Sequence, residues 1–529
     1  MSVDLVVLLA YMYVCLIIFT FVYELDVIMA HLKFKASYRS SDLAIVCYTS
    51  GDITLSHALI RQAEQGVRGE HDMRIVNSEI MFCEHGVVLS SGTDREIAAD
   101  NLQPADYVLR SSHLLYNTDG LILIGLNDNK HFYVTSSNIS FNSNGLKFEN
   151  WADAEGNIET HLYLSDSHVE RNRIGILDDT FAVRSDVTIE QSTFIGQTVN
   201  AYELHRYSFI DDNYAQLAVR DSHFIENSRE TFDLRCNNCF TSSWSFYNNR
   251  FVSNGREAIS ATHNSQENDD QQYLNLTIVN NTFQDSSSRY YSAMSINTAS
   301  MNDRVTCQNN TFDTLEGAIE FRGHESTNFS VVGNTFRNMG QRRVVIEIEK
   351  SAAYIGGNTF QQCTAPTLIY LHDRNDHVIT ENKFINNTMS SCLIEVHPDN
   401  PYDRFNSIQA NRNYWDTQDV HRIKGVICDF FLDSARPRVE MTEFYTSPDM
   451  STIVSNPNAD NFQYDVMSDL NTVVIGGVIT SSSDTSFVAS LGYTIVVNRS
   501  IIIASGVSVD LRSVTVEFAE NRGVVVFGE

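Results

Sequence analysis

Residues 334–384 read NTFRNMGQRRVVIEIEKSAAYIGGNTFQQCTAPTLIYLHDRNDHVITENKF and contain one short motif three times. The motif is Asn-x-Phe, and its copies begin at Asn334, Asn358 and Asn382, each 24 residues after the one before. Between copies lie a polar turn and a run of alternating apolar and polar residues, such as VIEI at 345–348. Such alternation indicates a strand with one buried face. A coil this short cannot bury its apolar face alone, so we expect successive coils to stack.

Earlier copies of the motif extend the array toward the N-terminus. Asn-x-Phe also begins at Asn249, Asn281 and Asn310, and looser forms end at Phe194 and Phe224. From Phe194 onward the Phe-to-Phe spacings are 30, 27, 32, 29, 24, 24 and 24 residues. This pattern predicts an all-β fold, a right-handed parallel β-helix of the pectate-lyase-like solenoid type. A leucine-rich repeat has a similar period, but it requires a Leu-x-x-Leu-x-Leu frame that the chain lacks.

The repeated Asn and Phe predict two columns along the stack. Asn tolerates the left-handed backbone of a sharp corner, and its amide can hydrogen-bond the Asn of the next coil. The Phe two residues later would point inward and stack on its equivalents. The predicted Asn ladder consists of Asn281, Asn310, Asn334, Asn358 and Asn382. The predicted Phe stack consists of Phe283, Phe312, Phe336, Phe360 and Phe384.

Patterning along the chain predicts five parts. The array is expected to end near Trp415, and residues 470–529 to begin a second β module that the chain does not complete. The predicted parts are an apolar signal- or anchor-like segment with its flank (1–35), irregular early β coils (36–130), the β-helix with its closing segment (131–440), a linker (441–469) and the start of a second β module (470–529).

Several features point to the secretory pathway. Residues 5–23 carry no charge, and their length suits the apolar part of a signal peptide or a membrane span. Because Asp4 precedes them and no Ala-x-Ala site is visible, a cleaved signal, an anchor and an incomplete N-terminus all remain open. Candidate N-glycosylation sites lie at Asn138, Asn275, Asn280, Asn309, Asn328, Asn386 and Asn498.

Cysteine and histidine spacing gives little sign of a metal site. Nine Cys are too few for a disulfide scaffold of this length. Cys236 and Cys239 form a CxxC, for which we expect a local disulfide or buried thiols. Zinc is disfavoured because no second CxxC or His pair at finger spacing follows. The sequence predicts no metal and no cofactor.

The charge balance restricts the partners. The chain has 37 Lys and Arg against 66 Asp and Glu, a formal net charge of −29. Such a surface repels phosphate backbones and anionic lipids. We therefore expect no nucleic-acid partner.

A polysaccharide-cleaving enzyme is the main alternative function. Paired carboxylates occur at 178–179, 211–212 and 269–270, and Arg422-Ile423-Lys424 spells a tripeptide found in polygalacturonases. The order is wrong for that family, because the one His-Gly, at 85–86, precedes every Asp pair. We therefore predict no catalytic residue, and regard a carbohydrate-active β-helix enzyme or glycan binder as the alternative. Three or more carboxylates, or an Arg with two, converging on one lateral face would favour it.

The C-terminal half carries a family resemblance. Residues 411–417 (NRNYWDT) interrupt the repeat, and 475–479 (IGGVI) open a differently spaced β series in which a strand ends as Val516-Glu517-Phe518. This order resembles a module junction of the protein bark beetle family, which comprises large animal cell-surface proteins of epithelial junctions. The resemblance covers about residues 130–529, although Asp416 replaces the usual Gly and Ser505 the usual Pro.

The resemblance implies a function. It predicts a non-catalytic extracellular adhesion module that contributes to cell–cell junctions or barrier assembly. Its partners would be other cell-surface proteins or glycans. Membrane attachment would run through residues 5–23 or through a C-terminal region missing from this sequence.

Overall fold

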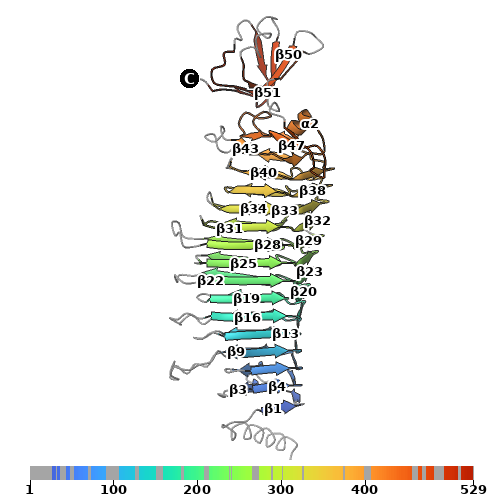
Figure 1. Ribbon diagram of the computed structural model, residues 1–529. Helices are drawn as coiled ribbons and strands as arrows, with labels where there is room; N and C mark the ends of the chain where they lie inside the picture. The colour runs from blue at the N-terminus through green and yellow to red at the C-terminus, as the bar shows by residue number, and fades with distance from the viewer. Residues whose placement is uncertain are drawn as a thin grey trace, which may run out of the picture. The chain divides into compact units, whose positions relative to one another are not determined.

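A computed structural model gives the architecture of two compact units, residues 1–236 and 237–529. It describes residues 27–30, 33–35, 43–47, 53–69, 73–90, 106–124, 130–149, 159–179, 184–207, 214–237, 239, 241–264, 273–286, 290–300, 302–324, 327–372, 376–397, 407–455, 463–466, 472–481, 494–509 and 514–527. Both units are built of coils with three strands each (Figure 1). The predicted apolar segment 5–23 lies outside the described residues.

The coils of unit 1 contribute one strand each to three parallel sheets. Sheet A contains β1 (Val27–Ala30), β4 (Ile53–Ser56), β7 (Met73–Val76), β10 (Asp106–Arg110), β13 (Lys130–Thr135), β16 (Glu159–Ser165), β19 (Arg184–Glu190) and β22 (Tyr214–Arg220). Sheet B contains β2 (Lys33–Lys35), β5 (Leu59–Arg61), β8 (Glu79–Met81), β11 (His113–Leu115), β14 (Asn138–Ser140), β17 (His168–Glu170), β20 (Thr193–Ile195) and β23 (His223–Ile225). Sheet C contains β3 (Leu43–Cys47), β6 (Gln65–Gly69), β9 (His85–Ser90), β12 (Asp119–Ile124), β15 (Asn144–Glu149), β18 (Ile174–Asp179), β21 (Tyr202–Tyr207) and β24 (Phe232–Asn237).

Unit 2 repeats the plan. Its sheet A contains β25 (Thr241–Tyr247), β28 (Tyr273–Val279), β31 (Arg304–Gln308), β34 (Asn328–Val332), β37 (Ala352–Gly356), β40 (Val378–Thr380), β43 (Ser407–Gln409) and β46 (Arg438–Glu440). Its sheet B contains β26 (Arg250–Val252), β29 (Thr282–Gln284), β32 (Thr311–Asp313), β35 (Thr335–Arg337), β38 (Thr359–Gln361), β41 (Lys383–Ile385), β44 (Asn413–Tyr414) and β47 (Glu443–Tyr445). Its sheet C contains β27 (Ile259–Asn264), β30 (Ser292–Thr298), β33 (Gly317–Arg322), β36 (Ile346–Glu349), β39 (Ile369–Leu371), β42 (Ile394–Val396) and β45 (Ile427–Cys428).

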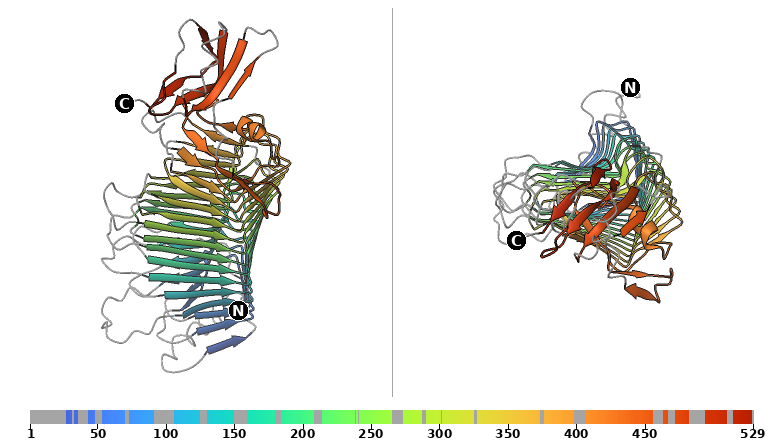
Figure 2. Two further views of the ribbon diagram at one scale, coloured as in Figure 1. Left: turned by 45° about the horizontal axis from the view of Figure 1, so that its top comes forward. Right: turned by 90° about the horizontal axis from the view of Figure 1, so that it is seen from above.

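Within each unit the strands of a sheet lie directly over one another, leaving three lateral faces (Figure 2). The predicted all-β, parallel β-helix fold is thereby confirmed. Inward positions carry Val, Ile, Leu and Phe and are buried, whereas the positions between them face solvent. This is the alternation expected of strands with one buried face.

The predicted Asn and Phe columns lie where the sequence placed them. Each ladder Asn is buried, and its Nδ2 donates to the Oδ1 of the next Asn over 2.9–3.1 Å, from Asn249 through to Asn413. The Phe rings stack with centroids 4.8–5.1 Å apart, beginning at Phe251. Trp415 continues the stack at 5.0 Å from Phe384.

Unit 1 uses a different corner chemistry. The residues of 36–130 were expected to form irregular coils, but those that are described follow the three-strand plan. Before each sheet B strand from β8 to β23 a Ser accepts a backbone N–H from the previous coil, as Ser112 does from Ser78. After the strand an Asn ladder includes Asn117 and Asn142. The shorter Ser side chain completes the same coil-to-coil bond that Asn makes in unit 2.

The stack continues beyond Trp415, the predicted end. Strands β43 to β47 keep the parallel register to Tyr445, because the interruption places helix α2 (Val420–Gly425) between β44 and β45 without displacing either strand. Part of the predicted linker 441–469 is therefore strand. β48 (Ile453–Ser455) pairs antiparallel with β47.

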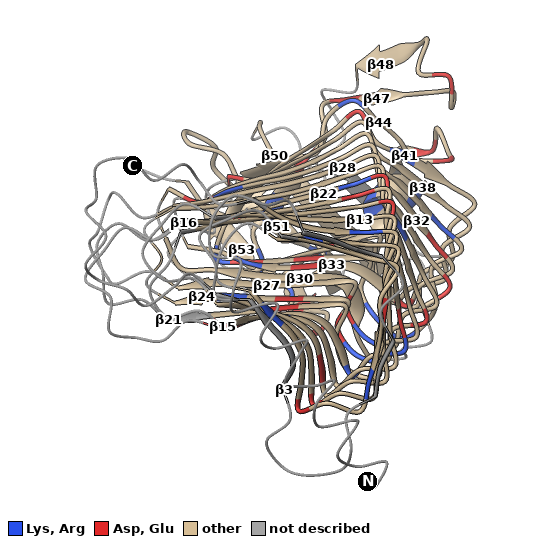
Figure 3. Ribbon diagram, turned by 90° about the horizontal axis from the view of Figure 1, so that it is seen from below, with Lys and Arg blue, Asp and Glu red and all other residues tan. Residues whose placement is uncertain are grey.

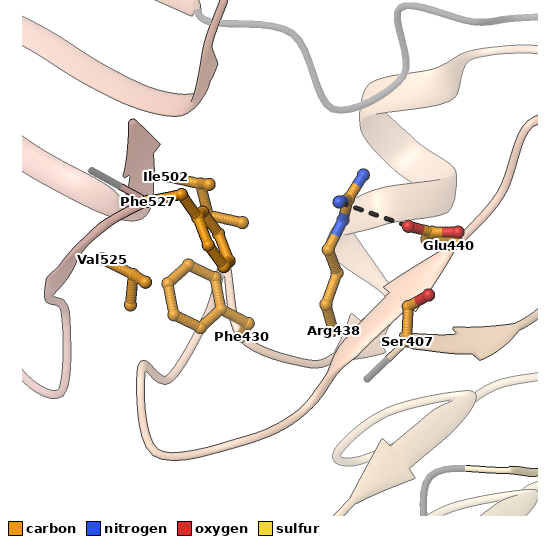
Figure 4. Close-up of a pocket in the computed structure, with 7 residues that line it drawn as sticks. All are labelled: Ser407, Phe430, Arg438, Glu440, Ile502, Val525 and Phe527. Carbon is orange, nitrogen blue, oxygen red and sulfur yellow. Dashed lines mark ion pairs between the residues drawn. The ribbon is translucent and has the colours of Figure 1, made fainter. Parts of the chain in front are cut away.

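A small separate sheet follows in unit 2, where the second β module was predicted. It contains β49 (Gln463–Val466), β50 (Thr472–Ile479), β51 (Thr494–Ile503), β52 (Thr515–Phe518) and β53 (Val524–Val526). Between the last coils and this sheet lies a cavity of about 50 Å³. Phe430, Ile502, Val525 and Phe527 form its apolar side, opposite the Arg438–Glu440 ion pair (Figure 4). A cavity of this size holds only a few water molecules.

In the part of the chain that the structure describes, no helix has both the length and the apolar character needed to cross a bilayer.

Candidate functional site

The lateral face of sheet C in unit 2 gathers the chemically richest side chains. We call the outward side chains of β30, β33, β36, β39 and β42 the sheet C face. The parallel register aligns one column of them, which consists of Ser295, Glu320, Glu347, Tyr370 and Glu395. Figure 3 shows acidic positions gathered at β33. Because stacked strands lie ~4.8 Å apart, these side chains are immediate neighbours.

Most carboxylates of the sheet C face have an arginine partner. Arg343 Nη2 lies 2.9 Å from Glu320 Oε2. Arg436 Nη1 lies 3.1 Å from Glu395 Oε1 and also donates to a backbone carbonyl.

A second column of the face contains another such pair. Arg322 Nε donates to Glu349 Oε2 over 2.6 Å. These three pairs neutralise much of the charge that the carboxylates bring to the face.

Glu347 has the most unusual environment of the four. Burial raises the pKa of its carboxyl, and the charges of Glu320 and Glu349 raise it further, against the opposing effect of Arg343 and Arg322. His372 pairs with it, with Nε2 at 3.7 Å from Glu347 Oε1. Glu347 therefore becomes protonated at a higher pH than an ordinary glutamate.

Aromatic and imidazole rings adjoin the carboxylates. His372 and His397 stack with ring centroids 4.7 Å apart. The ring of Tyr370 meets that of His372 edge-on at 4.4 Å. Carboxylates, guanidinium groups, imidazoles and a phenol together suit hydrogen bonding to hydroxyls, amides or charged side chains of a ligand.

Two histidines of unit 1 have acidic partners on its sheet C. The hydrogen bond that His85 Nδ1 makes to Asp119 Oδ2, over 3.0 Å, raises the pKa of His85. The nearby Asp233 carboxylate, with Oδ2 at 3.6 Å from His205 Nε2, likewise raises the pKa of His205. Among the described residues no group of three or more His, Cys, Asp or Glu is arranged to hold a metal ion.

The acid pairs named from the sequence do not assemble into a site. Asp178 is fully buried and accepts hydrogen bonds from the hydroxyls of Ser185 and Tyr202. Asp179 is exposed. The pairs at 211–212 and 269–270 lie outside the described residues.

The Arg422-Ile423-Lys424 tripeptide lies in helix α2 and belongs to the end of the stack. Ile423 is buried in the core. Lys424 is buried too, and its Nζ donates to the Val439 carbonyl over 3.0 Å. These contacts give the tripeptide a structural role.

The candidate glycosylation sites are mostly accessible. Asn138 is half-buried, and the other six Asn of the sequons are exposed: Asn275, Asn280, Asn309, Asn328, Asn386 and Asn498. Asn280, Asn309 and Asn386 have left-handed backbones at turns. These are positions where a bulky glycan would not disturb the core.

Cysteine pairing includes one bridge that the sequence did not indicate. Cys392 and Cys428 form a disulfide, with Cα atoms 5.8 Å apart, that joins neighbouring coils at sheet C. Cys236 and Cys239 are both in the disulfide state and fully buried.

Sequence reasoning missed the sheet C face, although a signal for it was present. The alternating runs that predicted the strands contain Glu320, Glu347, Tyr370 and Glu395, at spacings of 27, 23 and 25 residues. Adding one coil length to each outward residue gives the next. The spacing that predicted the inward Phe stack could therefore also have predicted this outward column.

The comparisons with known proteins leave the family open: no family model, no curated protein and no solved structure matches the chain.

Proposed function

We propose that this chain is a non-catalytic extracellular interaction module, which reaches the cell surface through the secretory pathway and binds another cell-surface protein or a glycan. The observation that carries the proposal is the sheet C face, an outward strip of paired charges and rings on a rigid stack. A filled interior leaves such a solenoid its lateral faces for binding. The resemblance to the bark beetle family adds adhesion or barrier assembly at epithelial contacts as the setting.

Two further features support the location. A disulfide between neighbouring coils persists in an oxidising compartment and is rare in the cytosol. Six exposed sequon asparagines offer acceptors that matter only in a secreted chain. Membrane attachment through residues 5–23 belongs to the same proposal.

The ion pairs favour binding over hydrolysis. Glycoside hydrolysis needs one protonated and one ionised carboxyl that are both available to substrate. Here Glu320, Glu349 and Glu395 are each held by an arginine. Polysaccharide cleavage is the second candidate, because the sheet C face does carry the three or more carboxylates on one lateral face that were expected to favour it. In addition Glu347, with its raised pKa, lies one coil from Glu320. That ~4.8 Å strand spacing is close to the ~5–5.5 Å carboxyl separation of retaining glycosidases.

The test uses the full chain expressed in epithelial cells. The variant Glu347→Ala/Tyr370→Ala/His397→Ala alters the sheet C face, and Tyr354→Ala, an exposed aromatic on sheet A at β37, is the matched control. We expect the triple variant to lose cell-surface or glycan-array binding about tenfold or more, and the control to keep it.

Other outcomes separate the parts of the proposal. Unchanged binding by the triple variant would show that the sheet C face is not the binding surface. If the wild-type chain releases reducing ends from neutral or acidic polysaccharides and Glu347→Gln abolishes this release, the chain is an enzyme instead. A cytosolic chain without glycans contradicts the proposed location, whichever face binds.

A further inference from the structure

Unit 1 carries a stack of three aromatic rings on its outside. Phe82, Tyr116 and Phe141 follow β8, β11 and β14, at the corner between sheets B and C. Their ring centroids are 5.1 Å and 4.8 Å apart and their planes are nearly parallel. The side chains are 53%, 47% and 36% exposed. We call this the corner stack.

The fold does not require aromatic residues at this corner. All three have left-handed backbones, with φ of 57°, 56° and 60°, a conformation that bulky residues disfavour. Other coils place small or polar residues at the same corner: Gln62, Gly196, Glu226, Ser253, Asp285, Thr314, Asn338, Gln362 and Asn386. Exposed rings on a disfavoured backbone are therefore an outlier that suggests a function.

The way the three rings stack on one another limits the kind of partner they can bind. Each ring covers the face of its neighbour, and Arg171 lies over the far face of Phe141 at 5.7 Å. A sugar would need an open ring face, whereas Tyr116 and Phe141 have both faces covered and expose their edges. Ring edges pack well against other apolar side chains. The order along the ridge is Phe, Tyr, Phe, which reads the same in both directions.

Charged residues beside the ridge are arranged with opposite signs at its two ends. On the sheet C side, successive coils place Glu64, Glu84, Thr118, Ser143 and Arg173 in one column. On the sheet B side, the register aligns Arg61, Met81, Leu115, Ser140 and Glu170. In both columns the first and last residues carry opposite charge, and the middle coil is that of Tyr116.

We propose that the corner stack binds a second copy of this chain, antiparallel, about a two-fold axis through the Tyr116 coil. In an isologous contact residue i meets j and j meets i. Phe82 then meets Phe141 of the second copy, and Tyr116 meets its own equivalent.

The same axis matches the flanking charges. It sets Glu64 against Arg173 of the second copy, and Arg61 against Glu170 of the second copy. One symmetry operation therefore makes the ridge and both flanking columns complementary.

Existing ion pairs do not prevent this arrangement. Arg61 lies 3.9 Å from Glu79, and Arg171 lies 3.4 Å from Glu170, which also accepts from His168. All are partly exposed pairs of the kind that contribute little in water. The ridge is narrow, so we expect a weak dimer with a dissociation constant in the micromolar range. The contact is independent of ligand binding by the sheet C face.

Replacing the rings tests the ridge in the full chain. In Phe82→Gln/Tyr116→Gln/Phe141→Gln the new residue is one that the same left-handed corner already carries at Gln62 and Gln362, and it creates no glycosylation sequon, so thermal stability should be kept. Sedimentation equilibrium should show self-association weakened about 30-fold or more. A wild-type chain that stays monomeric, or a dimer that the triple variant preserves, overturns the proposal.

A charge exchange tests the symmetry. Glu64→Arg and Arg173→Glu should each weaken the dimer about tenfold. Each single variant places two like charges opposite one another, and the two-fold axis repeats this contact, so the repulsion occurs twice per dimer. The double variant restores both pairs with reversed sign and should recover dimerisation. Loss that persists in the double variant contradicts the antiparallel two-fold.

A crosslink locates the axis. Thr118 lies exposed in the middle coil, so Thr118→Cys should be linked to its equivalent by a short bis-maleimide. Thr314→Cys, exposed at the same corner of unit 2, is the control and should not be linked. Equal linking of both variants contradicts the proposed axis.

Discussion

Glu347 occupies the least favourable environment among the carboxylates of the sheet C face. Its neighbours in the column are Glu320 on one side and Tyr370 on the other. Among the residues that the structure describes, its ion-pair partner is His372, whereas Glu320 pairs with Arg343. Burial and the like charges raise the pKa of its carboxyl. A group whose pKa is higher in the folded state destabilises the fold at pH values where it must be ionised. A charged side chain that lowers folding stability at a solvent-facing position is typical of a residue kept for binding.

Replacing Glu347 by Gln is therefore expected to stabilise the protein at neutral pH. The gain should be a few tenths to about 1 kcal/mol, since the group is partly exposed. It should vanish below about pH 4, where the carboxyl is protonated in both folded and unfolded chains. Urea unfolding at several pH values measures this. Glu349→Gln is the control, and it should destabilise slightly because it removes the partner of Arg322. A destabilising Glu347→Gln at neutral pH would refute the assignment.

At the scale of the coil, two inward columns define the unit 2 stack. Each ladder Asn bonds forward to the next Asn and back to a carbonyl, as Asn334 does to Asn358 and to Cys307 O. The rings of Phe283, Phe312, Phe336 and Phe360 are each buried between two other Phe rings, and Phe384 lies between Phe360 and Trp415. Errors in register would break both columns at once, so the two columns fix the same alignment.

Truncating one ring of the Phe stack tests this column. Phe336→Ala removes a ring that lies 4.9 Å from Phe312 and 4.8 Å from Phe360, and should cost ~3–5 kcal/mol of unfolding free energy. Phe336→Leu keeps most of the volume, so its cost should be under ~1.5 kcal/mol. Urea unfolding compares the two. A loss below ~1 kcal/mol for the alanine variant would mean that the stack contributes little.

The sequence predicted elements well wherever one residue type repeats. The Asn-x-Phe motif located the unit 2 coils because the same corner and the same ring recur at nearly constant spacing. Unit 1 was harder because Ser112 and its equivalents fill that corner, and Ser is too common to stand out. The sheet C face was missed since its members differ in type, and only the register brings Glu320, Glu347 and Tyr370 together. The Cys392–Cys428 bridge joins residues 36 apart, a spacing that matches no motif.

At the scale of the whole molecule, the oxidation state of the cysteines bears on both the folding stability of the chain and its cellular compartment. Cys83, Cys307 and Cys363 are buried free thiols, and burial raises the pKa of Cys307 to about 12 and that of Cys363 to about 11. Thiols this weakly acidic react slowly at neutral pH. Cys392 and Cys428 are oxidised instead. Reductant should therefore act on the described part of the chain chiefly through its disulfides.

Removing the bridge with Cys392→Ser/Cys428→Ser should lower stability under oxidising conditions. The closed loop spans 36 residues, for which loop-closure entropy gives an upper value of ~4 kcal/mol. The effect should disappear when wild type and variant are compared in reductant, because both then lack the bridge. Cys363→Ala is the control, since it removes a free thiol and its smaller loss should be the same with and without reductant. Thiol labelling of the chain taken directly from epithelial cells completes the test. Protection of Cys392 and Cys428 there agrees with passage through the secretory pathway, whereas labelling of both would contradict the proposed extracellular location even if the purified protein forms the bridge.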